Sequence, residues 1–471
     1  MNSAISGVEA STSDQFLRVE EHGIEPIPVD ERHGRARELG FLWAGAFVNY
    51  ASLLTASLAT TFFGLGVWDG LAATALGTVA GALMLGLLSH TGPRSGLPQI
   101  AFTRRIFGRN GAKVGAFLTL FLAVGWFAVD TVIASQAGVQ MFKLAGFGDA
   151  ASRFAFPLVL VIAGLSVLVA VYGHATIKVF ETFGAIAFAA LSLVLFVVLA
   201  PKFNWTAGPT VQGADFPGAF VLAFMVCFAL VASWFPFASD YSRYLPHNTP
   251  AGGLTWWPVL GVTAPMILLG LFGLLLPTID PRLAASASGG PLAVVTQHAP
   301  PFIAVLFFVF VVLGEIWANY LDVYTAGLVT LTMGIRLKRW ETALGCGILG
   351  TVLATYAVVI QDFHVAYQQF LLLTYLWAPA WAAIVLLAFY AHGERHPVPA
   401  LVAWGLGTVV SLFFVNYPNI FGPASFFNQP LINALHGADL SGLVSAAVAG
   451  TAYTLILRFG RAQVQQTVAG R

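Results

Sequence analysis

Three acidic residues lie inside long apolar stretches of the sequence, away from the polar segments where carboxyl groups usually occur. Asp130 follows the run AFLTLFLAVGWFAV, and Glu315 and Asp322 interrupt the apolar run that begins near residue 301. A carboxyl group at the centre of a bilayer costs about 2.5–3.5 kcal/mol on insertion scales, so it is expected to face a bundle interior or a water-filled cavity. These acids are therefore the first candidates for chemistry.

The acids have polar and aromatic neighbours at helical spacing. Glu315, Asn319 and Asp322 are spaced i, i+4 and i+7, which places them along one stripe of a helix. Trp126 precedes Asp130 by one turn, so an indole and a carboxyl group share a face there. The alternative is that each acid is protonated and forms a hydrogen bond to a neighbouring helix, with a structural role only. Three acids with an amide and an indole on the same faces favour a shared polar cavity.

The composition places these residues in a protein that crosses a membrane many times. Of 471 residues, 58% are hydrophobic and 9% are charged, and the mean hydropathy is +0.80. A helix needs about 20 apolar residues to cross the hydrocarbon core, and the apolar runs lack the period-2 alternation of a β-barrel. We expect twelve transmembrane helices, near residues 40–66, 70–89, 113–142, 155–173, 177–200, 217–240, 254–277, 300–331, 342–360, 366–391, 398–415 and 437–458.

Positive charge predicts the orientation of these spans. With the N-terminus inside, only four of the 22 Lys and Arg residues fall on the outer side, and they are Lys143, Arg153, Lys202 and Arg282. Residues 1–38 are polar, rich in Glu and Asp, and contain no cleavable signal, so we expect a cytoplasmic tail there and a second one at 459–471. Both termini are thus expected in the cytoplasm, with the spans in the plasma membrane.

Two expected spans carry signs of a broken helix. The sixth contains Pro236 within VASWFPFASDYS, and a proline there frees carbonyl groups that lipid cannot satisfy. The first contains Asn49, Ser52 and Thr55 at intervals of three residues. Transporters built from inverted repeats use such breaks to hold a substrate at the middle of the membrane. A proline kink satisfied by neighbouring helices is the alternative, but the pairing of both signs makes Asn49 and Ser52 candidate substrate-binding residues.

Other classes of membrane protein have less support in the sequence. All ten histidines fall in the tail, in loops or at span ends, and no HExxH motif is present, so we expect neither an enzyme nor a metal centre or other cofactor. Cys227 and Cys346 lie inside expected spans, which argues against disulfides. No selectivity loop of a channel is evident, and no nucleic-acid partner is indicated. A nutrient receptor without net transport stays open as a different class.

Motifs of moderate specificity follow one another over nearly the whole chain: GIEPIPVDERHG, WDG, GLPQIAFTRRIFGRNGA, GWFAVD, SWFPFASDYSRYLP and YLDVYTAGL. Together they resemble the nucleobase:cation symporter family, and within it the purine-cytosine permease branch. The resemblance implies an all-α, LeuT-like fold. Helices 1–5 (39–200) and 6–10 (217–391) would form two inverted repeats, followed by two extra helices (398–458). Spans 3 and 8 would then be equivalent, so that Asp130 and Asp322 approach one cavity.

The resemblance also implies a binding site for a nucleobase or related planar nitrogen heterocycle, which is imported with a cation by alternating access. Trp126 matches an aromatic position that stacks on the base, a contact worth about 1–3 kcal/mol. Asp130 and Asp322 match amide positions that bind the edge of the base. The resemblance implies three further site residues. Asn319 lies one turn before Asp322, and Ser233 and Trp234 lie in the unwound part of the sixth span.

Two departures from the family pattern bear on the substrate and the coupling ion. Asp130 and Asp322 stand where relatives have Asn, so the site offers acceptors that favour a donor-bearing ligand such as cytosine or an aminopurine. Sodium-coupled relatives place hydroxyls just after Glu315, where Ile316 and Trp317 stand here. We therefore expect H⁺ as the coupling ion with Glu315 as its carrier, since burial favours a protonated carboxyl. The alternative is a sodium-coupled symporter of allantoin, hydantoin or a thiamine-precursor pyrimidine.

Overall fold

The computed structural model describes residues 23–172, 174–285, 290–360, 363–416 and 425–469, and every regular element within these ranges is helical. In lipid, an apolar run folds as a helix because each backbone N–H and C=O group needs a partner within the segment. The helices of the first half are α1 (Ala36–Phe47), α2 (Tyr50–Thr61), α3 (Val67–Leu88), α4 (Thr91–Ser95), α5 (Gln99–Phe102), α6 (Arg104–Phe142), α7 (Ala155–Tyr172) and α8 (His174–Leu199). Those of the second half are α9 (Asp215–Ala232), α10 (Ala238–Ser242), α11 (Ala251–Leu275), α12 (Pro281–Ala284), α13 (Gly290–His298), α14 (Pro301–Met333), α15 (Arg339–Ile360), α16 (Phe363–Leu387), α17 (Pro397–Ser411), α18 (Ser425–Ala434) and α19 (Ser441–Ala469).

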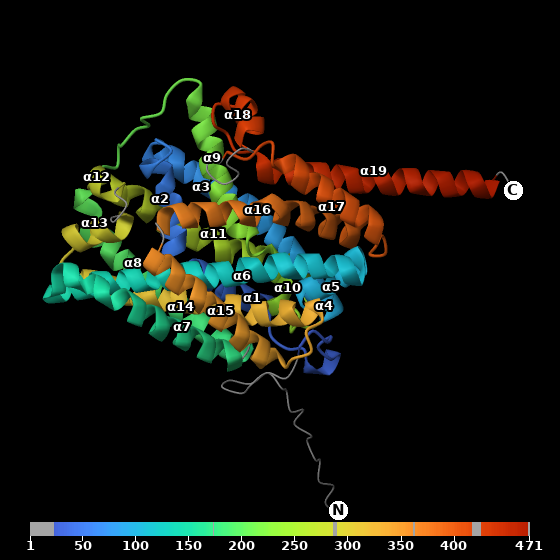
Figure 1. Cartoon of the computed structure of the whole chain (residues 1–471), viewed down its shortest axis with the longest axis horizontal. Helices are drawn as coiled ribbons and strands as arrows, with labels where there is room; N and C mark the ends of the chain where they lie inside the picture. Colours follow the sequence, from blue (N-terminus) through green and yellow to red (C-terminus); the bar gives the residue numbers. More distant parts are fainter. Residues whose placement is uncertain (1–22, 173, 286–289, 361–362, 417–424, 470–471) are drawn as a thin grey trace, which may run out of the picture.

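Several long helices, among them α6, α11, α16 and α19, run along the long axis of the molecule (Figure 1). The short helices α4, α5 and α10 gather toward one end of the bundle, and α12 and α13 lie at the opposite end (Figure 1). The backbone N–H of Ile27 donates to the carbonyl oxygen of Gly96, directly after α4, at 3.0 Å. We call the end with α4, α5 and α10 the tail end, because the segment that precedes α1 is fastened there.

The first expected span is a broken helix, as its polar residues predicted. Helices α1 and α2 meet at an angle of 62°, with Val48 and Asn49 between them. The side chain of Asn49 caps α2, because its oxygen accepts a hydrogen bond from the N–H of Ser52 at 3.0 Å. Its Nδ2 donates to the carbonyl oxygen of Ala46 at 3.0 Å, so one amide group satisfies backbone atoms on both sides of the break.

The sixth expected span is interrupted at the proline. Helix α9 ends at Ala232, a single 3₁₀ turn follows at Phe235–Phe237, and α10 then resumes the span. Pro236 lies inside that turn, where its missing N–H removes a helical hydrogen bond. Both breaks predicted from the sequence are therefore present in the structure.

In the described part of the chain, seven helical segments are long and apolar enough to cross a membrane, or eight if the bent pair α1–α2 is one span. One of these segments, residues 104–168, covers two expected spans, and shorter apolar helices occupy 186–202, 376–392 and 397–411. The all-helical class is thus confirmed, and the count of twelve stays a prediction. The two largest boundary differences are that α6 starts nine residues before the expected span and that α19 continues through residues expected to form the C-terminal tail.

Close approach of helix backbones explains how the bundle packs. The most extensive contact is between α6 and α14, the two helices that carry the intramembrane acids. Gly77 of α3 lies against the carbonyl group of Phe224 in α9, and Gly273 of α11 lies against that of Leu53 in α2. Small residues at such positions let helices approach closely in lipid, where the hydrophobic effect does not drive helices together.

Candidate functional site

Helices α6 and α14 bring the three intramembrane acids together. The exposed fractions are 2% for Asp130 and 0% for Glu315 and Asp322. The carboxyl groups of Asp130 and Glu315 interact directly, and Asp322 lies within electrostatic range of both. Like charges at this depth repel one another strongly. The cluster therefore needs a proton, a cation or a donor-bearing ligand to be stable.

Glu315 joins this cluster to the break in the first span. Its Oε1 accepts hydrogen bonds from the N–H groups of Tyr50 at 2.8 Å and Ala51 at 3.3 Å, the first residues of α2. These N–H groups have no intrahelical partner, and the positive end of the helix dipole favours a carboxylate there. Gly314 allows the approach, since a Cβ at this position would lie 3.2 Å from the carbonyl oxygen of Val48.

Several acceptor atoms of the cluster have no donor within the described ranges. They are Oδ1 of Asp130, Oε2 of Glu315, both carboxyl oxygens of Asp322 and Oδ1 of Asn319. Leaving a buried polar atom unpaired costs about 1–3 kcal/mol. So many unpaired acceptors in one region make it the candidate binding site.

Asn319 uses its amide nitrogen to connect helices. Its Nδ2 donates to Oγ1 of Thr131 in α6 at 3.0 Å and to Oγ of Ser166 in α7 at 3.3 Å. Sequence reasoning missed Thr131 and Ser166, whose only signal was a hydroxyl at membrane depth. The amide of Asn319 therefore ties α14 to two neighbouring helices, while its oxygen stays available.

Trp126 lies one turn before Asp130 on α6 and is 3% exposed. The ring of Phe370 in α16 packs edge-on against it, with centroids 5.3 Å apart and an interplanar angle of 82°. Phe370 gave no signal in the sequence, because it is one of many phenylalanines in apolar runs. The indole thus packs against a residue from a distant helix and shares the face of a buried acid.

The remaining candidates lie at the two helix breaks. Asn49 and the N–H of Ser52 are paired in the α2 cap described above, and Oγ of Ser233 donates to the carbonyl oxygen of Leu230 at 2.7 Å. Trp234 packs against α1, where its ring meets that of Trp43 edge-on at 5.7 Å. Trp43 is fully buried and was also missed by sequence reasoning. The candidates therefore form two groups: the acids with Trp126 and Asn319, and the residues that shape the breaks.

The arrangement suits binding and proton loading more than metal chemistry. Across the described residues, no three His, Cys, Asp or Glu side chains are placed to hold one metal ion. The acids instead offer acceptors beside an aromatic ring, at a helix break that contributes backbone N–H groups. Carboxyl groups beside an aromatic ring are the kind of groups with which proteins bind flat, donor-bearing solutes and transfer protons.

The chain matches the family model described as a permease for cytosine/purines, uracil, thiamine and allantoin over residues 26–445. It is 28% identical to the Bacillus subtilis (strain 168) protein YxlA, across 94% of this chain and 96% of that protein. It is also 24% identical to the purine-cytosine permease FCY2 of Saccharomyces cerevisiae, over 72% of this chain and 66% of FCY2.

Solved structures share the fold. Mhp1, a nucleobase-cation-symport-1 family transporter in a closed conformation with bromovinylhydantoin bound, superposes with a TM-score of 0.70 at 15% identity. The match covers 93% of this chain and 95% of Mhp1. A Na⁺-coupled sialic acid symporter in an outward-open state gives a TM-score of 0.59 at 11% identity. At these identities the likeness concerns the architecture alone.

Proposed function

Because this chain belongs to the family of permeases for cytosine/purines, uracil, thiamine and allantoin, we propose that it imports a nucleobase-like heterocycle together with protons. The protein is a multi-pass membrane transporter, and members of its family are transporters rather than enzymes. We place it in the plasma membrane with both termini in the cytoplasm. The positive charge of the inner loops supports this orientation.

The finer architecture is part of the proposal. Twelve spans, ten of them in two inverted repeats of five, agree with the broken first and sixth helices. In this arrangement α6 and α14 are the third and eighth spans, which accounts for the meeting of Asp130 and Asp322 from two repeats. Alternating access then means that the two halves move around a fixed site at the middle of the membrane.

Cytosine or an aminopurine is the substrate that the site favours. Trp126 provides a ring for stacking, and the unpaired oxygens of Asp130 and Asp322 can accept the amino and ring N–H groups of such a base. A base that presents mainly carbonyl oxygens would leave those acceptors unpaired. This contrast supports cytosine over uracil and hydantoin, which carry fewer N–H donors.

The contact between Glu315 and α2 carries the coupling proposal. An ionised Glu315 is stabilised by the two N–H groups at the start of α2, and a protonated Glu315 holds them less firmly. Loading and release of a proton at this one carboxyl group would therefore change how the first span is held at its break. Ile316 and Trp317 offer no side-chain oxygen for sodium nearby.

Glu315→Gln tests this proposal in proteoliposomes. The amide oxygen can still accept from Tyr50 and Ala51, but the side chain can no longer carry a proton. We expect proton-driven accumulation of labelled cytosine to be lost, while exchange against internal cytosine continues. Glu341→Gln, at the start of α15, is the control and should accumulate cytosine normally. Undiminished proton-driven uptake by Glu315→Gln would exclude this residue as the carrier, and absence of any exchange in the unmodified protein would favour a receptor.

A further inference from the structure

Two buried charged residues near the tail end take no part in the proposed binding and coupling steps. Asp240 lies in α10 and is 1% exposed. Arg243 is the first residue after α10 and is 0% exposed. A charge is tolerated in the interior only when hydrogen bonds replace its water. The partners of these two side chains therefore show what α10 is fastened to.

Three side-chain hydrogen bonds and a ring contact join the end of the sixth span to α14. We call this contact the seam. The rings of Tyr241 and Tyr324 stack across it with centroids 5.8 Å apart. The hydrogen bonds run from Thr325 Oγ1 to Asp240 Oδ2 at 2.6 Å, from Tyr241 Oη to the carbonyl oxygen of Leu321 at 3.1 Å, and from Arg243 Nη2 to Tyr324 Oη at 3.1 Å.

The seam lies between the acidic cluster and the tail end. Arg104, at the start of α6, donates to the carbonyl oxygen of Thr332 at 2.7 Å, so the last turns of α14 lie beside α5 and α6 at that end. Residues 324 and 325 follow Asp322 in this direction along α14. Along α14, the seam therefore separates the acidic cluster from the tail end.

Arg243 also holds the chain that precedes α1. Its Nη1 donates to the carbonyl oxygen of Gly23 at 2.8 Å, and the N–H of His33 donates to the carbonyl oxygen of Tyr244 at 2.7 Å. We call residues 23–35 the strap. One guanidinium group thus binds the strap and the seam together.

The strap is fastened at its centre as well. Arg32 donates through Nη1 to the carbonyl oxygen of Pro93 at 2.7 Å and through Nε to that of Ile27 at 2.9 Å. Arg32 is partly buried, and this burial lowers the pKa of its guanidinium from the usual value. The side chain of Ile27 is only 1% exposed. The strap is therefore a packed part of the tail end, in contact with α4 and with the sixth span.

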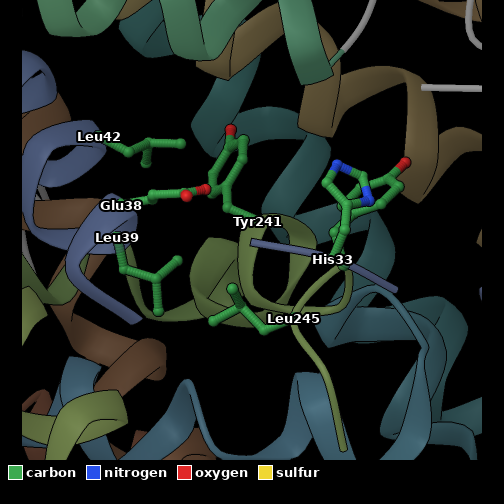
Figure 2. Close-up of a pocket in the computed structure, with 7 residues that line it drawn as sticks. His33, Glu38, Leu39, Leu42, Tyr241 and Leu245 are labelled. Carbon is green, nitrogen blue, oxygen red and sulfur yellow. The ribbon is translucent and has the colours of Figure 1, made fainter. Parts of the chain in front are cut away.

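Figure 2 shows how closely these parts fit. His33 of the strap, together with Glu38 and two leucines of α1, lies around Tyr241 of α10 and Leu245, which follows α10. The cavity between them measures about 10 Å³, which is room for about one water molecule. This cavity is too small for a ligand, so the strap, α1 and α10 pack directly against one another here.

We propose that the strap is a latch that holds the seam closed and is released each time the site opens toward the tail end. In the closed state, the Gly23 carbonyl group accepts a hydrogen bond from Nη1 of Arg243 while Nη2 of that residue donates to Tyr324. Release of the strap removes an acceptor from a buried charge, so the closed state loses stability relative to the open one. The latch changes the equilibrium between the closed and the open state. Its effect does not depend on which solute the site binds.

Labelling of a single cysteine measures the opening directly. Ala318 is fully buried and lies one turn before Asp322 on the same face of α14, so Ala318→Cys in a Cys227→Ser, Cys346→Ser background reports access to the site. A membrane-impermeant maleimide is added to inside-out vesicles, whose sidedness is checked by protease removal of a C-terminal tag. We expect deletion of residues 2–34 to raise the labelling rate about fivefold, because the closed state loses its latch.

Deletion of residues 2–22 is the matched control, since it shortens the tail and leaves the strap, and its labelling rate should equal that of the full chain. Equal rates with and without the strap, or an increase already present in the shorter deletion, would overturn the proposal. If the longer deletion does not give monodisperse protein, the full-length variant Arg32→Ala replaces it. An increase of about twofold in its labelling rate supports the latch, and an unchanged labelling rate overturns it. No substrate enters this assay, so failed cytosine exchange would count against the proposed function alone.

Discussion

Asp322 is the acid of the cluster with the largest unmet hydrogen-bonding capacity. Neither of its oxygens has a donor within the described part of the chain, and the side chain is fully buried. We expect Asp322→Asn to lower the preference for cytosine over uracil about tenfold, because an amide supplies donors that suit the carbonyl edge of uracil. Competition of both bases against labelled substrate in proteoliposomes measures this preference.

Asp149→Asn is the control for that experiment, since Asp149 lies in an exposed turn between α6 and α7. Its preference should equal that of the unmodified protein. An unchanged preference in Asp322→Asn, at normal abundance, would remove Asp322 from the binding site. The same comparison with Asp130→Asn shows whether the acid beside Trp126 contributes.

Asn319 illustrates how one side chain can serve stability at a binding site. Its amide nitrogen bonds Thr131 and Ser166 on two neighbouring helices. Interhelical hydrogen bonds in membranes contribute about 0.6–1.7 kcal/mol, so Asn319→Ala should lower the unfolding free energy by that amount. Thermal unfolding in detergent measures the change. Ser166→Ala, which leaves the bond to Thr131, should cost less, and an equal cost for both variants would contradict this account.

At the level of helices, close backbone approach sets which spans can pack. A Cβ on Gly77 of α3 would collide with the carbonyl oxygen of Phe224 in α9. We expect Gly77→Ala to force these helices apart and cost about 1–3 kcal/mol, as overpacking does in other cores. Size-exclusion chromatography and melting of the purified protein measure the loss. Gly405→Ala in α17 is the control, because no atom lies within 4 Å of its added Cβ, and equal losses in both variants would refute the packing argument.

The helix breaks operate at the same scale. Asn49 caps α2, Glu315 binds the first N–H groups of α2, and Trp234 packs against α1. The first break thus exposes backbone N–H groups whose partners are the side chains of Asn49 and Glu315, as lipid requires. The first span is consequently held at its break by α14, the helix that carries two of the acids.

For the whole molecule, the identity of the coupling ion is the property that a transport assay measures most directly. We expect replacement of external sodium by choline to leave cytosine uptake unchanged, since Ile316 and Trp317, which directly follow Glu315, provide no side-chain oxygens for sodium. Collapse of an inward proton gradient with a protonophore should stop accumulation in the same vesicles. A steep requirement for sodium would instead favour the sodium-coupled alternative.

Hydropathy and helical spacing predicted a large part of this protein from the sequence. Local patterns of residues predict the membrane environment and the all-helical class. They also predict the depth of Asp130, Glu315 and Asp322 and the breaks near Asn49 and Pro236. These properties are local because a run of about 20 residues interacts with lipid as a unit, whatever its neighbours are. The order of motifs then indicated the family.

Only the tertiary structure decided which partner each polar group has. Asn319 shares a stripe with Glu315, yet its amide turns to α6 and α7, whereas Glu315 reaches α2, some 265 residues away in the chain. Arg243 is fully buried and binds the strap. Its position in the sequence predicted only that it is one of the positive charges on the cytoplasmic side. Such pairings depend on the rotation and register of packed helices, which arise from close contact of whole surfaces and leave no periodic trace in any one segment.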